Sequence, residues 1–148
     1  MTLQGEYVPS PWDWVREQVD RYEASGGTEA NTLRDTGMPI IVVTTRGAQS
    51  GAVRKFALMR VEHDGAYALV GSMGGAPKNP AWVSNIRTHP DEVLLQDGPA
   101  PWPADVREID GDERAQWWER CVAAFPPYAE YQTKTGRVIP VFLATPRG

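Results

Sequence analysis

The chain has 148 residues and a formal net charge of −4, with 41% hydrophobic and 23% charged residues. This length predicts a single domain with its own core, and the acidic balance argues against general nucleic-acid binding. No apolar run approaches the roughly 20 residues that span a bilayer, and the first residues lack the pattern of a secretory signal, so we expect a cytoplasmic protein without an integral membrane segment.

The residues that usually build metal or nucleophilic centres are few. Cys121 is the single cysteine, which excludes an intrachain disulfide and a cysteine cluster for zinc. His63 and His89 both stand at predicted turns, where isolated histidines are ordinary surface residues. No serine lies in a Gly-x-Ser-x-Gly elbow, which leaves a hydrolase triad unsupported. We therefore expect no metal site and no nucleophile of the protein's own.

An amphipathic helix is predicted near the N-terminus. Ser10 and Asp13 have the spacing of a capping box, with Pro11 at the first helical position, and Ser25-Gly26-Gly27 ends the helix. The apolar stripe of this helix consists of Trp12, Val15, Val19 and Tyr22. Such a stripe predicts packing against the domain. A lid over an active site and a peripheral contact with the inner face of the cell membrane are the alternatives.

Six strands are predicted from β-branched and alternating apolar runs. The first three, residues 40–45, 54–61 and 66–70, are separated by glycine-containing turns and predict consecutive hairpins. Three more cover residues 92–96, about 104–109 and 138–143; prolines before the fifth, and Pro140 within the sixth, favour sheet edges. The fold class is therefore α+β and mainly antiparallel β, with the sheet of residues 28–148 curled into a small barrel. Residues 1–27 form the helix and its tether, within one domain overall.

Two or three short helices accompany the sheet. Asp110 and Glu113 form a second capping pair, and Pro126-Pro127 ends the helix that they begin. Its apolar stripe consists of Ala115, Trp118, Val122 and Phe125. A shorter helix is predicted from Tyr128 to Lys134, closed by Gly136.

The stretch from Gly71 to Trp82 is the first place to look for function. The pair Gly74-Gly75 lets the backbone approach a ligand, and Lys78 adds a cation. Asn79 suits an N-cap and Pro80 suits the first turn of a helix. The stretch also loosely imitates a dinucleotide fingerprint, but the helix after Pro80 has only roughly 8–10 residues, too few for a parallel crossover. A plain surface loop is the other alternative.

A second basic segment carries Arg54 and Lys55 on the first hairpin. If this hairpin and the central loop meet at one end of the sheet, their cations form a phosphate site; otherwise the charges belong to a solvated turn. Trp82, Tyr128 and Tyr131 offer flat aromatic walls nearby. A site with cations that can bind phosphate and with flat aromatic walls, but without a catalytic acid, base or nucleophile, suits a protein whose cofactor carries the chemistry.

Four ordered motifs now resemble one known family over residues 37–146. The motifs are Thr44-Thr45-Arg46-Gly47 with Ser50-Gly51 and Arg54; Gly74-Gly75-Ala76-Pro77-Lys78-Asn79-Pro80-Ala81-Trp82 with Asn85; Gln96-Asp97-Gly98; and Tyr128-Ala129-Glu130-Tyr131-Gln132 with Thr135 and Ile139-Pro140-Val141. In these motifs the sequence resembles the deazaflavin-dependent nitroreductase family of actinobacteria, which are split β-barrel oxidoreductases related to flavin-binding pyridoxamine oxidases and use reduced coenzyme F-420.

The resemblance implies a set of site residues. It places the phosphate and tail of F-420 at the first hairpin, the deazaflavin ring along Val70 to Gly74 and over Pro80 to Trp82, and the substrate beside Tyr128 and Tyr131, the two candidate catalytic residues. The implied cofactor-binding residues are Thr44, Gln49, Ser50, Gly51, Val53, Arg54, Lys55, Val70, Ser72, Met73, Gly74, Gly75, Lys78, Asn79, Pro80, Ala81 and Trp82.

The implied activity is hydride transfer from reduced F-420 to a small, planar, hydrophobic acceptor: a quinone, a nitroaromatic or an unsaturated lactone. Departures from the family pattern, at Ala57, Met73 and Val83, fall where substrates are chosen, so the acceptor stays open. Two alternatives remain, an FMN-dependent reductase on the same barrel and a carrier that binds a deazaflavin or lipid-like molecule without turnover. Both a monomer and a homodimer are compatible with the sequence.

Overall fold

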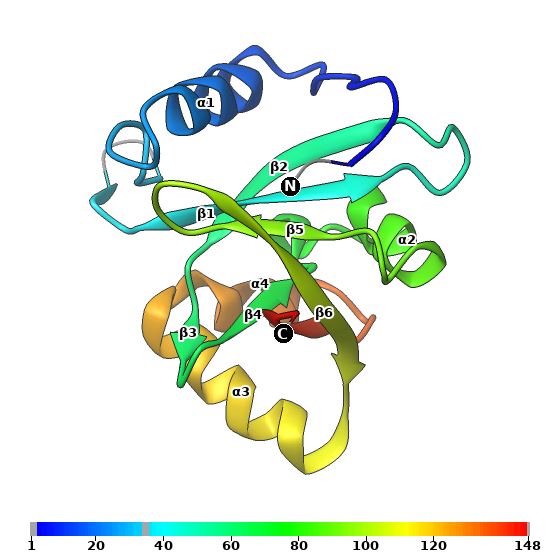
Figure 1. Cartoon of the computed structure of the whole chain (residues 1–148). Helices are drawn as coiled ribbons and strands as arrows, with labels where there is room; N and C mark the ends of the chain where they lie inside the picture. Colours follow the sequence, from blue (N-terminus) through cyan, green and yellow to red (C-terminus); the bar gives the residue numbers. More distant parts are fainter. Residues whose placement is uncertain (1–2, 34–35, 148) are drawn as a thin grey trace.

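One curled antiparallel sheet organises the chain in the computed structural model, which describes residues 3–33 and 36–147 (Figure 1). Its seven strands are hydrogen-bonded in the order β2-β1-β5-β6-β7-β4-β3. Their bounds are β1 (Ile40–Arg46), β2 (Val53–Met59), β3 (Glu62–His63), β4 (Ala66–Val70), β5 (Leu94–Gln96), β6 (Pro101–Ile109) and β7 (Val141–Pro146). The predicted fold class, a mainly antiparallel split barrel, is confirmed.

The two outer strands of this sheet follow one another in the chain. Only Arg60 and Val61 separate β2 from β3, and the Val61 carbonyl accepts a hydrogen bond of 2.9 Å from the Ala68 amide. The sheet therefore curls back toward its own beginning. The first predicted hairpin is confirmed, with Thr45 opposite Arg54. The second differs from the prediction, because β2 ends at Met59 and the short β3, rather than β2, pairs with β4.

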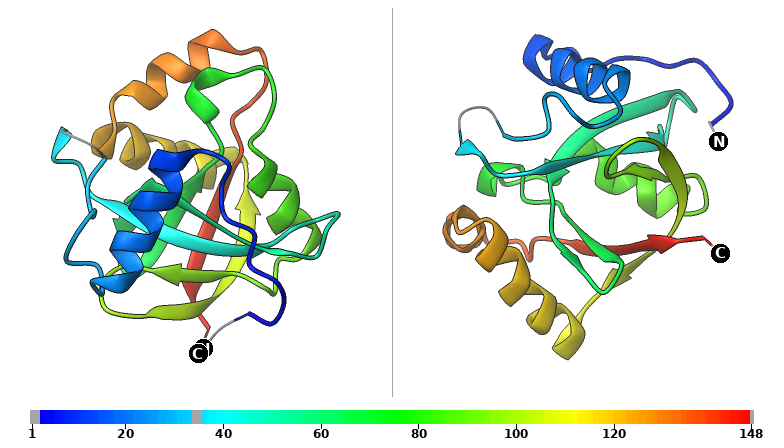
Figure 2. Two further views of the ribbon diagram at one scale, coloured as in Figure 1. Left: turned by 90° about the horizontal axis from the view of Figure 1, so that it is seen from above. Right: turned by 60° about the vertical axis from the view of Figure 1, so that its left-hand side comes forward.

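In the described part of the chain, four α-helices and the 3-10 turn before α2 surround the sheet. They are α1 (Asp13–Ala24), the 3-10 turn η2 (Met73–Gly75), α2 (Ala81–Thr88), α3 (Gly111–Ala124) and α4 (Pro127–Lys134). In Figure 1, α1 lies across β1 and β2 at the top, and α3 lies at the bottom; the two turned views of Figure 2 keep this separation. Within the described residues, none of these helices is both long and apolar enough to span a bilayer.

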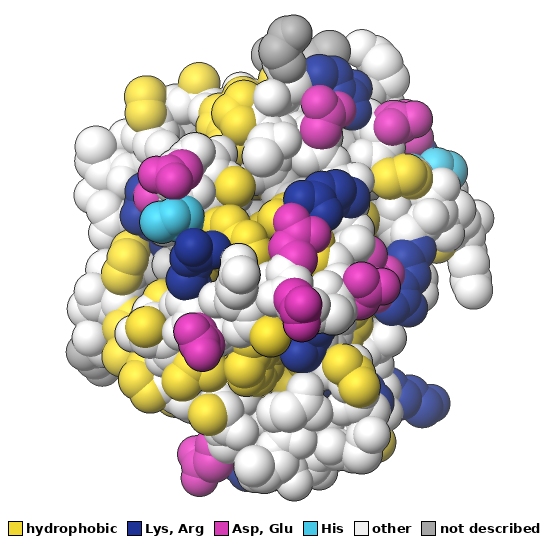
Figure 3. Space-filling model, turned by 90° about the horizontal axis from the view of Figure 1, so that it is seen from below, with side chains coloured by type: hydrophobic (Ala, Val, Ile, Leu, Met, Phe, Trp, Pro, Cys, Tyr) yellow, Lys and Arg dark blue, Asp and Glu magenta, His cyan; other side chains and the backbone are white. Residues whose placement is uncertain are grey.

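Strand alternation divides the core into two clusters. Side chains on one face of β1, including Ile40 and Val42, pack with Tyr22 of α1 and Trp117 of α3. Ile41 and Val43, on the other face of β1, pack with Trp82 and Val83 of α2 and with Phe142 of β7. Seen from below, the surface mixes acidic, basic and apolar side chains, in keeping with the modest net charge (Figure 3).

Several predicted helix ends are wrong by one to three residues. Helix α1 begins after Trp12, and Ser10 accepts a hydrogen bond from the Trp12 amide instead of capping the helix. Helix α2 begins after Pro80, so Asn79 is no N-cap. Asp110 does stand at the N-cap of α3, but without a side-chain cap bond, and Glu113 binds Arg107 instead of closing a capping box. At α2 and α3, an arginine binds a side chain that was predicted to cap the helix: Arg137 binds Asn79, and Arg107 binds Glu113.

The apolar stripes and the proline-rich strands also differ in detail. On α1, Val19 and Tyr22 are buried as predicted, whereas Trp12 is 67% exposed. On α3, Trp117 and Cys121 face the core, and Ala115 is exposed.

Strand β6 is no sheet edge, because it lies between β5 and β7. Its prolines are tolerated since residues 101–103 pair only with β5 and residues 104–109 only with β7. Strand β7 begins after Pro140 rather than at Val138, which keeps that proline out of the ladder. Helix α4 ends at Lys134, with Thr135 rather than Gly136 at its C-cap.

Candidate active site

A cavity of about 290 Å³ lies where several parts of the chain meet. Most of its lining comes from α1, from the residues of β2 near Met59, from the loop at Ser72–Gly74, from the beginning of α2 at Pro80, and from α4 with the preceding Phe125; Leu33, Ile40 and Val70 complete it. Side chains around it are mostly apolar, and the polar groups are concentrated in the loop and in the two tyrosines of α4. This arrangement suits a flat, largely apolar ligand.

The α4 wall is a cluster of aromatic rings. Tyr128 lies with its ring centroid 5.0 Å from Phe125 and 6.3 Å from Tyr131, both edge-on, and Phe125 and Tyr131 are 6.2 Å apart. Among the residues described, neither tyrosine hydroxyl has a hydrogen-bond partner, although Tyr128 is only 3% exposed. Burial raises the pKa of Tyr128 well above the ordinary value. The Tyr128 hydroxyl therefore stays protonated and can donate a hydrogen bond.

The part of the cavity wall formed by α2 is fixed by aromatic contacts of Trp82. Trp82 lies parallel to Phe56, with ring centroids 5.1 Å apart and an interplanar angle of 13°, and it also contacts Phe142. Since Trp82 is 8% exposed and pinned on two sides, it cannot rotate without disturbing the core. Pro80, directly before α2, contributes a rigid edge to the same wall.

The central loop approaches α4 as closely as glycine allows. Gly75 has φ +81, and a Cβ atom there would lie 2.7 Å from the Tyr131 carbonyl oxygen. Gly74 also has a positive φ, but a Cβ atom there would meet open space. Met73 adopts φ +46 and is 59% exposed beside the cavity. The Gly-Gly pair thus serves the close contact between loop and helix, with Gly75 as the tight position.

Arg137 fixes this loop from outside the cavity. Its guanidinium donates to the carbonyl oxygens of Ala76 (2.9 Å), Gly71 (3.1 Å) and Ser72 (2.8 Å), and to Oδ1 of Asn79 (2.7 Å). Burial lowers the pKa of Arg137, and its partners are carbonyl groups rather than carboxylates. Sequence reasoning missed this residue, because a lone arginine between a glycine and a strand carries no motif.

Eight of the predicted site residues line the cavity together. They are Val70, Ser72, Met73, Gly74, Pro80 and Trp82 from the predicted ring site, and Tyr128 and Tyr131 from the predicted substrate side. The others lie outside it: Thr44, Gln49, Ser50, Gly51, Val53, Arg54, Lys55, Gly75, Lys78, Asn79 and Ala81. The cavity therefore unites the predicted ring and substrate residues and leaves out the predicted phosphate grip.

The first hairpin does not meet the central loop on neighbouring strands. Strands β1 and β4, which lead into the two connections, are separated in the sheet by β5, β6 and β7. The hairpin is instead anchored near the C-terminal end of α2, where Asn85 accepts from the Ala48 amide and donates to Thr45. The central loop enters the N-terminal end of α2, which spans eight residues, or about 12 Å.

The two cations of that hairpin point to opposite faces of β2. Lys55 lies opposite Thr44, on the face that α1 covers, and its ammonium group contacts both carboxylate oxygens of Glu23 at 2.8 Å. Arg54 lies opposite Thr45, and the described residues provide it with no hydrogen bond or ion pair. Of the predicted pair, Arg54 alone is available to an anion.

Other cavity residues were not predicted. Trp14 and Gln18 reach it from α1, and Gln18 is fixed by donating to the carbonyl oxygens of Ala30 and Thr32. Phe125 was assigned only to a helix stripe. The signal that could have found Trp14 is its place off the apolar stripe of α1, since a tryptophan outside the packing face needs another contact surface.

A curled antiparallel barrel with a largely aromatic and apolar cavity suits a split-barrel oxidoreductase that relies on a bound redox cofactor. Residues 14–146 match the model of the family described as F420H(2)-dependent quinone reductase, and the chain belongs to this family. It is therefore an F-420-dependent reductase, and reduced F-420 is its hydride donor, which settles the choice against FMN and against a carrier without turnover.

Relatives agree with this assignment. The chain is 30% identical over 112 residues to an F420H(2)-dependent quinone reductase of Mycobacterium tuberculosis, covering 74% of each chain. It is similar to a solved F420-H2 dependent reductase, with 52% identity, a TM-score of 0.67 and coverage of 72% of this chain and 93% of that one. Another solved chain, described as a domain-swapped dimer, has 50% identity, a TM-score of 0.69 and coverage of 91% of this chain and 99% of that one.

The cavity fits such a cofactor in shape and in donors. Its flat walls suit a conjugated ring, and the amides of Ser72 and Met73, which have no acceptor within the described residues, lie at its edge. At about 290 Å³ the cavity is at the lower end of small-molecule sites, which begin at roughly 300 Å³.

Proposed function

We propose that this reductase transfers a hydride from reduced F-420 to a quinone. The observation that carries the proposal is the α4 wall, where aromatic rings stand beside two tyrosine hydroxyls that make no hydrogen bond within residues 3–33 and 36–147. A quinone is flat and apolar over its face, and its two carbonyl oxygens need hydrogen-bond donors. The wall offers both kinds of contact at one place.

Protein groups orient the reaction and exclude water. The bound cofactor supplies the hydride, and conversion of the quinone to its hydroquinone takes that hydride and one further proton. The loop at Ser72–Gly74 and the Pro80–Trp82 edge hold one flat partner, and Tyr128 and Tyr131 hold the other at about 3–3.5 Å from it. Because burial raises the pKa of Tyr128, the phenol donates a hydrogen bond to the oxygen that gains charge, while solvent completes protonation.

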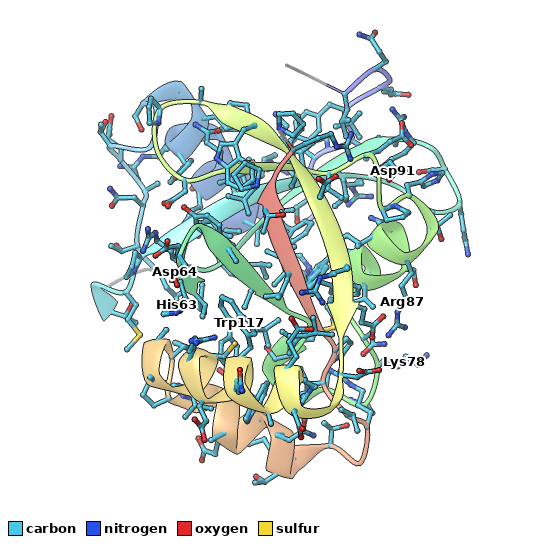
Figure 4. The ribbon with its side chains drawn as sticks, turned by 60° about the horizontal axis from the view of Figure 1, so that its bottom comes forward. His63, Asp64, Lys78, Arg87, Asp91 and Trp117 are labelled. Carbon is cyan, nitrogen blue, oxygen red and sulfur yellow. The ribbon has the colours of Figure 1, made fainter. Side chains whose placement is uncertain are left out.

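The anionic tail of the cofactor is proposed to bind cations outside the cavity. Arg54 makes no hydrogen bond or ion pair in the described part of the chain, although its charge acts on nearby Tyr7, and Lys78 projects outward from the loop before α2 (Figure 4). Lys55 supports this role less, because Glu23 already neutralises it. The remaining hairpin residues predicted to bind the tail stay part of this proposal.

Helix α1 is proposed to act as one edge of a lid. Its C-terminal half is buried at Val19 and Tyr22, whereas Trp14 in its first turns lines the cavity and is 45% exposed. A membrane-facing role for the neighbouring, exposed Trp12 is the alternative. A truncate lacking the residues before Thr28 separates these: an unchanged apparent KM for apolar quinones in a stable truncate contradicts the lid.

Anaerobic turnover tests the proposed function. The purified protein is mixed with reduced F-420 and menadione, and the absorbance of the oxidised cofactor is followed, with protein-free and menadione-free mixtures as controls. We expect oxidation that depends on both protein and quinone. If the cofactor binds but menadione gives no rate above background, while a nitroaromatic or an unsaturated lactone does, the quinone assignment is wrong.

The assembly state is a separate proposal. A homodimer is suggested by the related chain described as a domain-swapped dimer, which this chain covers almost completely. Light scattering at micromolar concentration measures the mass directly. A mass of 16.4 kDa would show a monomer.

A further inference from the structure

Arg137 occupies a place that ordinary packing does not explain. It stands between α4, which carries the two tyrosines, and β7, and its guanidinium donates four hydrogen bonds, all to residues 71–79 of the central loop. Arg137 is half-buried, and in the described residues its guanidinium bonds to carbonyl oxygens and a side-chain amide rather than to a carboxylate, so neutral dipoles stabilise its charge. Four bonds of 2.7–3.1 Å to one short loop indicate that the loop conformation is what this residue fixes.

The guanidinium also determines where the loop amides point. Two of its partners are the carbonyl oxygens of Gly71 and Ser72. The described chain contains no cis peptide bond, and in a trans peptide the N–H points opposite to the C=O. The amides that share these two peptide units belong to Ser72 and Met73, so both point away from Arg137.

Those amides lie on the cavity side of the loop. Ser72 and Met73 line the cavity, and Arg137 does not. Neither amide donates to any acceptor in residues 3–33 or 36–147, whereas the following amides of Gly75 and Ala76 close the 3-10 turn. Ser72 is also buried, so its amide lacks free access to water. Two oriented donors without partners, at the edge of a cavity, are a preformed site for an electron-rich acceptor group.

We propose that Arg137 is a positioning residue that aims and polarises the Ser72 and Met73 amides toward the electronegative edge of the bound cofactor ring. This rests on the proposed placement of that ring in the cavity. Polarised donors stabilise the electron-rich reduced ring more than the oxidised ring. Arg137 thereby tunes the relative affinity for the two redox forms without touching the cofactor.

The ratio of two dissociation constants separates this role from simple scaffolding. Oxidised F-420 is titrated by its fluorescence, and reduced F-420 by anaerobic competition against the oxidised form. In Arg137→Ala we expect the Kd of the reduced form to rise at least about tenfold more than that of the oxidised form, which corresponds to the loss of one charge-assisted bond. Arg137→Lys, which keeps the charge and up to three donors, should recover most of the preference.

Matched variants control for folding. Arg147→Ala removes another arginine, one that donates to the carbonyls of Asp91 and Ala104 far from the cavity lining, and should leave both constants unchanged. Asn79→Ala removes one partner of Arg137 and should change the ratio by less than threefold. If Arg137→Ala is unstable by melting temperature, Arg137→Met, which keeps the length of the side chain but neither its charge nor its donors, replaces it with the same expected change of the ratio, and an unchanged ratio in that variant contradicts the inference.

Two outcomes overturn the inference. Equal weakening of both redox forms in Arg137→Ala would leave Arg137 as scaffold only, and unchanged constants would remove even that role. The test does not depend on the acceptor: parental protein that binds F-420 but fails to reduce menadione contradicts the proposed function while the ratio still tests Arg137. If the variant Gly74→Val, which changes the cavity wall, binds F-420 as tightly as the parental protein does, the proposed placement of the ring is wrong instead.

Discussion

The first hairpin and the central loop look alike in sequence and behave differently in the structure. Both are glycine-containing connections with basic residues. In the hairpin the cations are split between two faces of β2, and Glu23 neutralises one of them. In the loop, Arg137 donates hydrogen bonds to the carbonyl oxygens of Gly71 and Ser72. The amides of the same peptide units belong to Ser72 and Met73, which line the cavity. Glycine and charge mark where a ligand can approach, and the partners of the neighbouring groups decide where it binds.

Gly75 and Gly74 sharpen this comparison within the loop itself. A Cβ atom at Gly75 would collide with the Tyr131 carbonyl, so Gly75→Ala should destabilise the protein by about 2–4 kcal/mol through strain and lost packing against α4. Gly74→Ala is the matched control, because it has a positive φ but free space, and should cost about 1 kcal/mol. Denaturant unfolding measures both; equal losses would show that the contact with α4 is not tight.

Tyr128 is expected to have the largest effect on turnover. Tyr128→Phe should keep the fold and nearly the same cofactor affinity, and a lost polarising bond lowers kcat/KM by up to roughly 2.7–4 kcal/mol. Single-turnover hydride transfer measures this step. A rate within twofold of the parent would leave Tyr128 as a packing residue and move the role to Tyr131 or to water.

The same residue predicts a pH profile. Burial raises the pKa of Tyr128 above its unfolded value of about 10, so the phenol stays protonated through that pH in the folded protein. Hydride transfer should therefore not fall between neutral pH and about 10. The stability linked to this group is fully present below the unfolded pKa and is lost as pH rises further. A single-turnover rate that declines with a midpoint below 9 would contradict a buried neutral donor.

Arg54 tests whether the hairpin binds the cofactor at all. If it grips the anionic tail, Arg54→Ala should raise the Kd for F-420 by about ten- to a hundredfold, as expected for one charge-assisted bond. Lys55→Ala is the comparison, and we expect a smaller change because Glu23 already pairs with that ammonium group. An unchanged titration curve for Arg54→Ala would return the hairpin to a solvated turn.

The Lys55–Glu23 pair gives the smallest expected effect. Both side chains are partly exposed, so Glu23→Gln should reduce stability by only about 0.5–1 kcal/mol. If this pair holds α1 against β2, the variant should also raise the apparent KM for menadione, because Trp14 then leaves the cavity edge more often. The ion pair Arg16–Asp13, within α1, is the control: Asp13→Asn should leave KM unchanged.

Local sequence patterns predicted where strands and helices form better than they predicted which strands pair with one another. The β-branched run at residues 40–45 and the stop at Gly26-Gly27 appear as expected, because each depends on local conformation. Strand β4 pairs with β3, whereas the sequence predicted that it pairs with β2. This difference depends on how the whole sheet curls, and no short stretch of sequence carries that information. Asn79 and Glu113 suited caps, but arginines distant in sequence or on the preceding strand bind them instead.

The site follows the same rule. Tyr128, Tyr131 and Trp82 were identified because aromatic residues at these positions belong to a motif, and they do meet at the cavity. Arg137 and Trp14 were missed because their roles come from tertiary contacts alone. Alternation along β2 would have warned that Arg54 and Lys55 cannot face one phosphate, since consecutive residues of a strand point to opposite sides.

The position of β7 determines how late in folding the active-site cavity can form. This strand follows β4 and β6 in the chain yet is inserted between them, so each of its two ladders joins segments far apart in sequence. Such long-range pairing forms late and slowly in folding. Arg137 lies just before β7, and the loop that it holds precedes it by about 60 residues. A nascent chain can therefore make its first hairpin early, but it acquires a working cavity only when almost the whole sequence has left the ribosome.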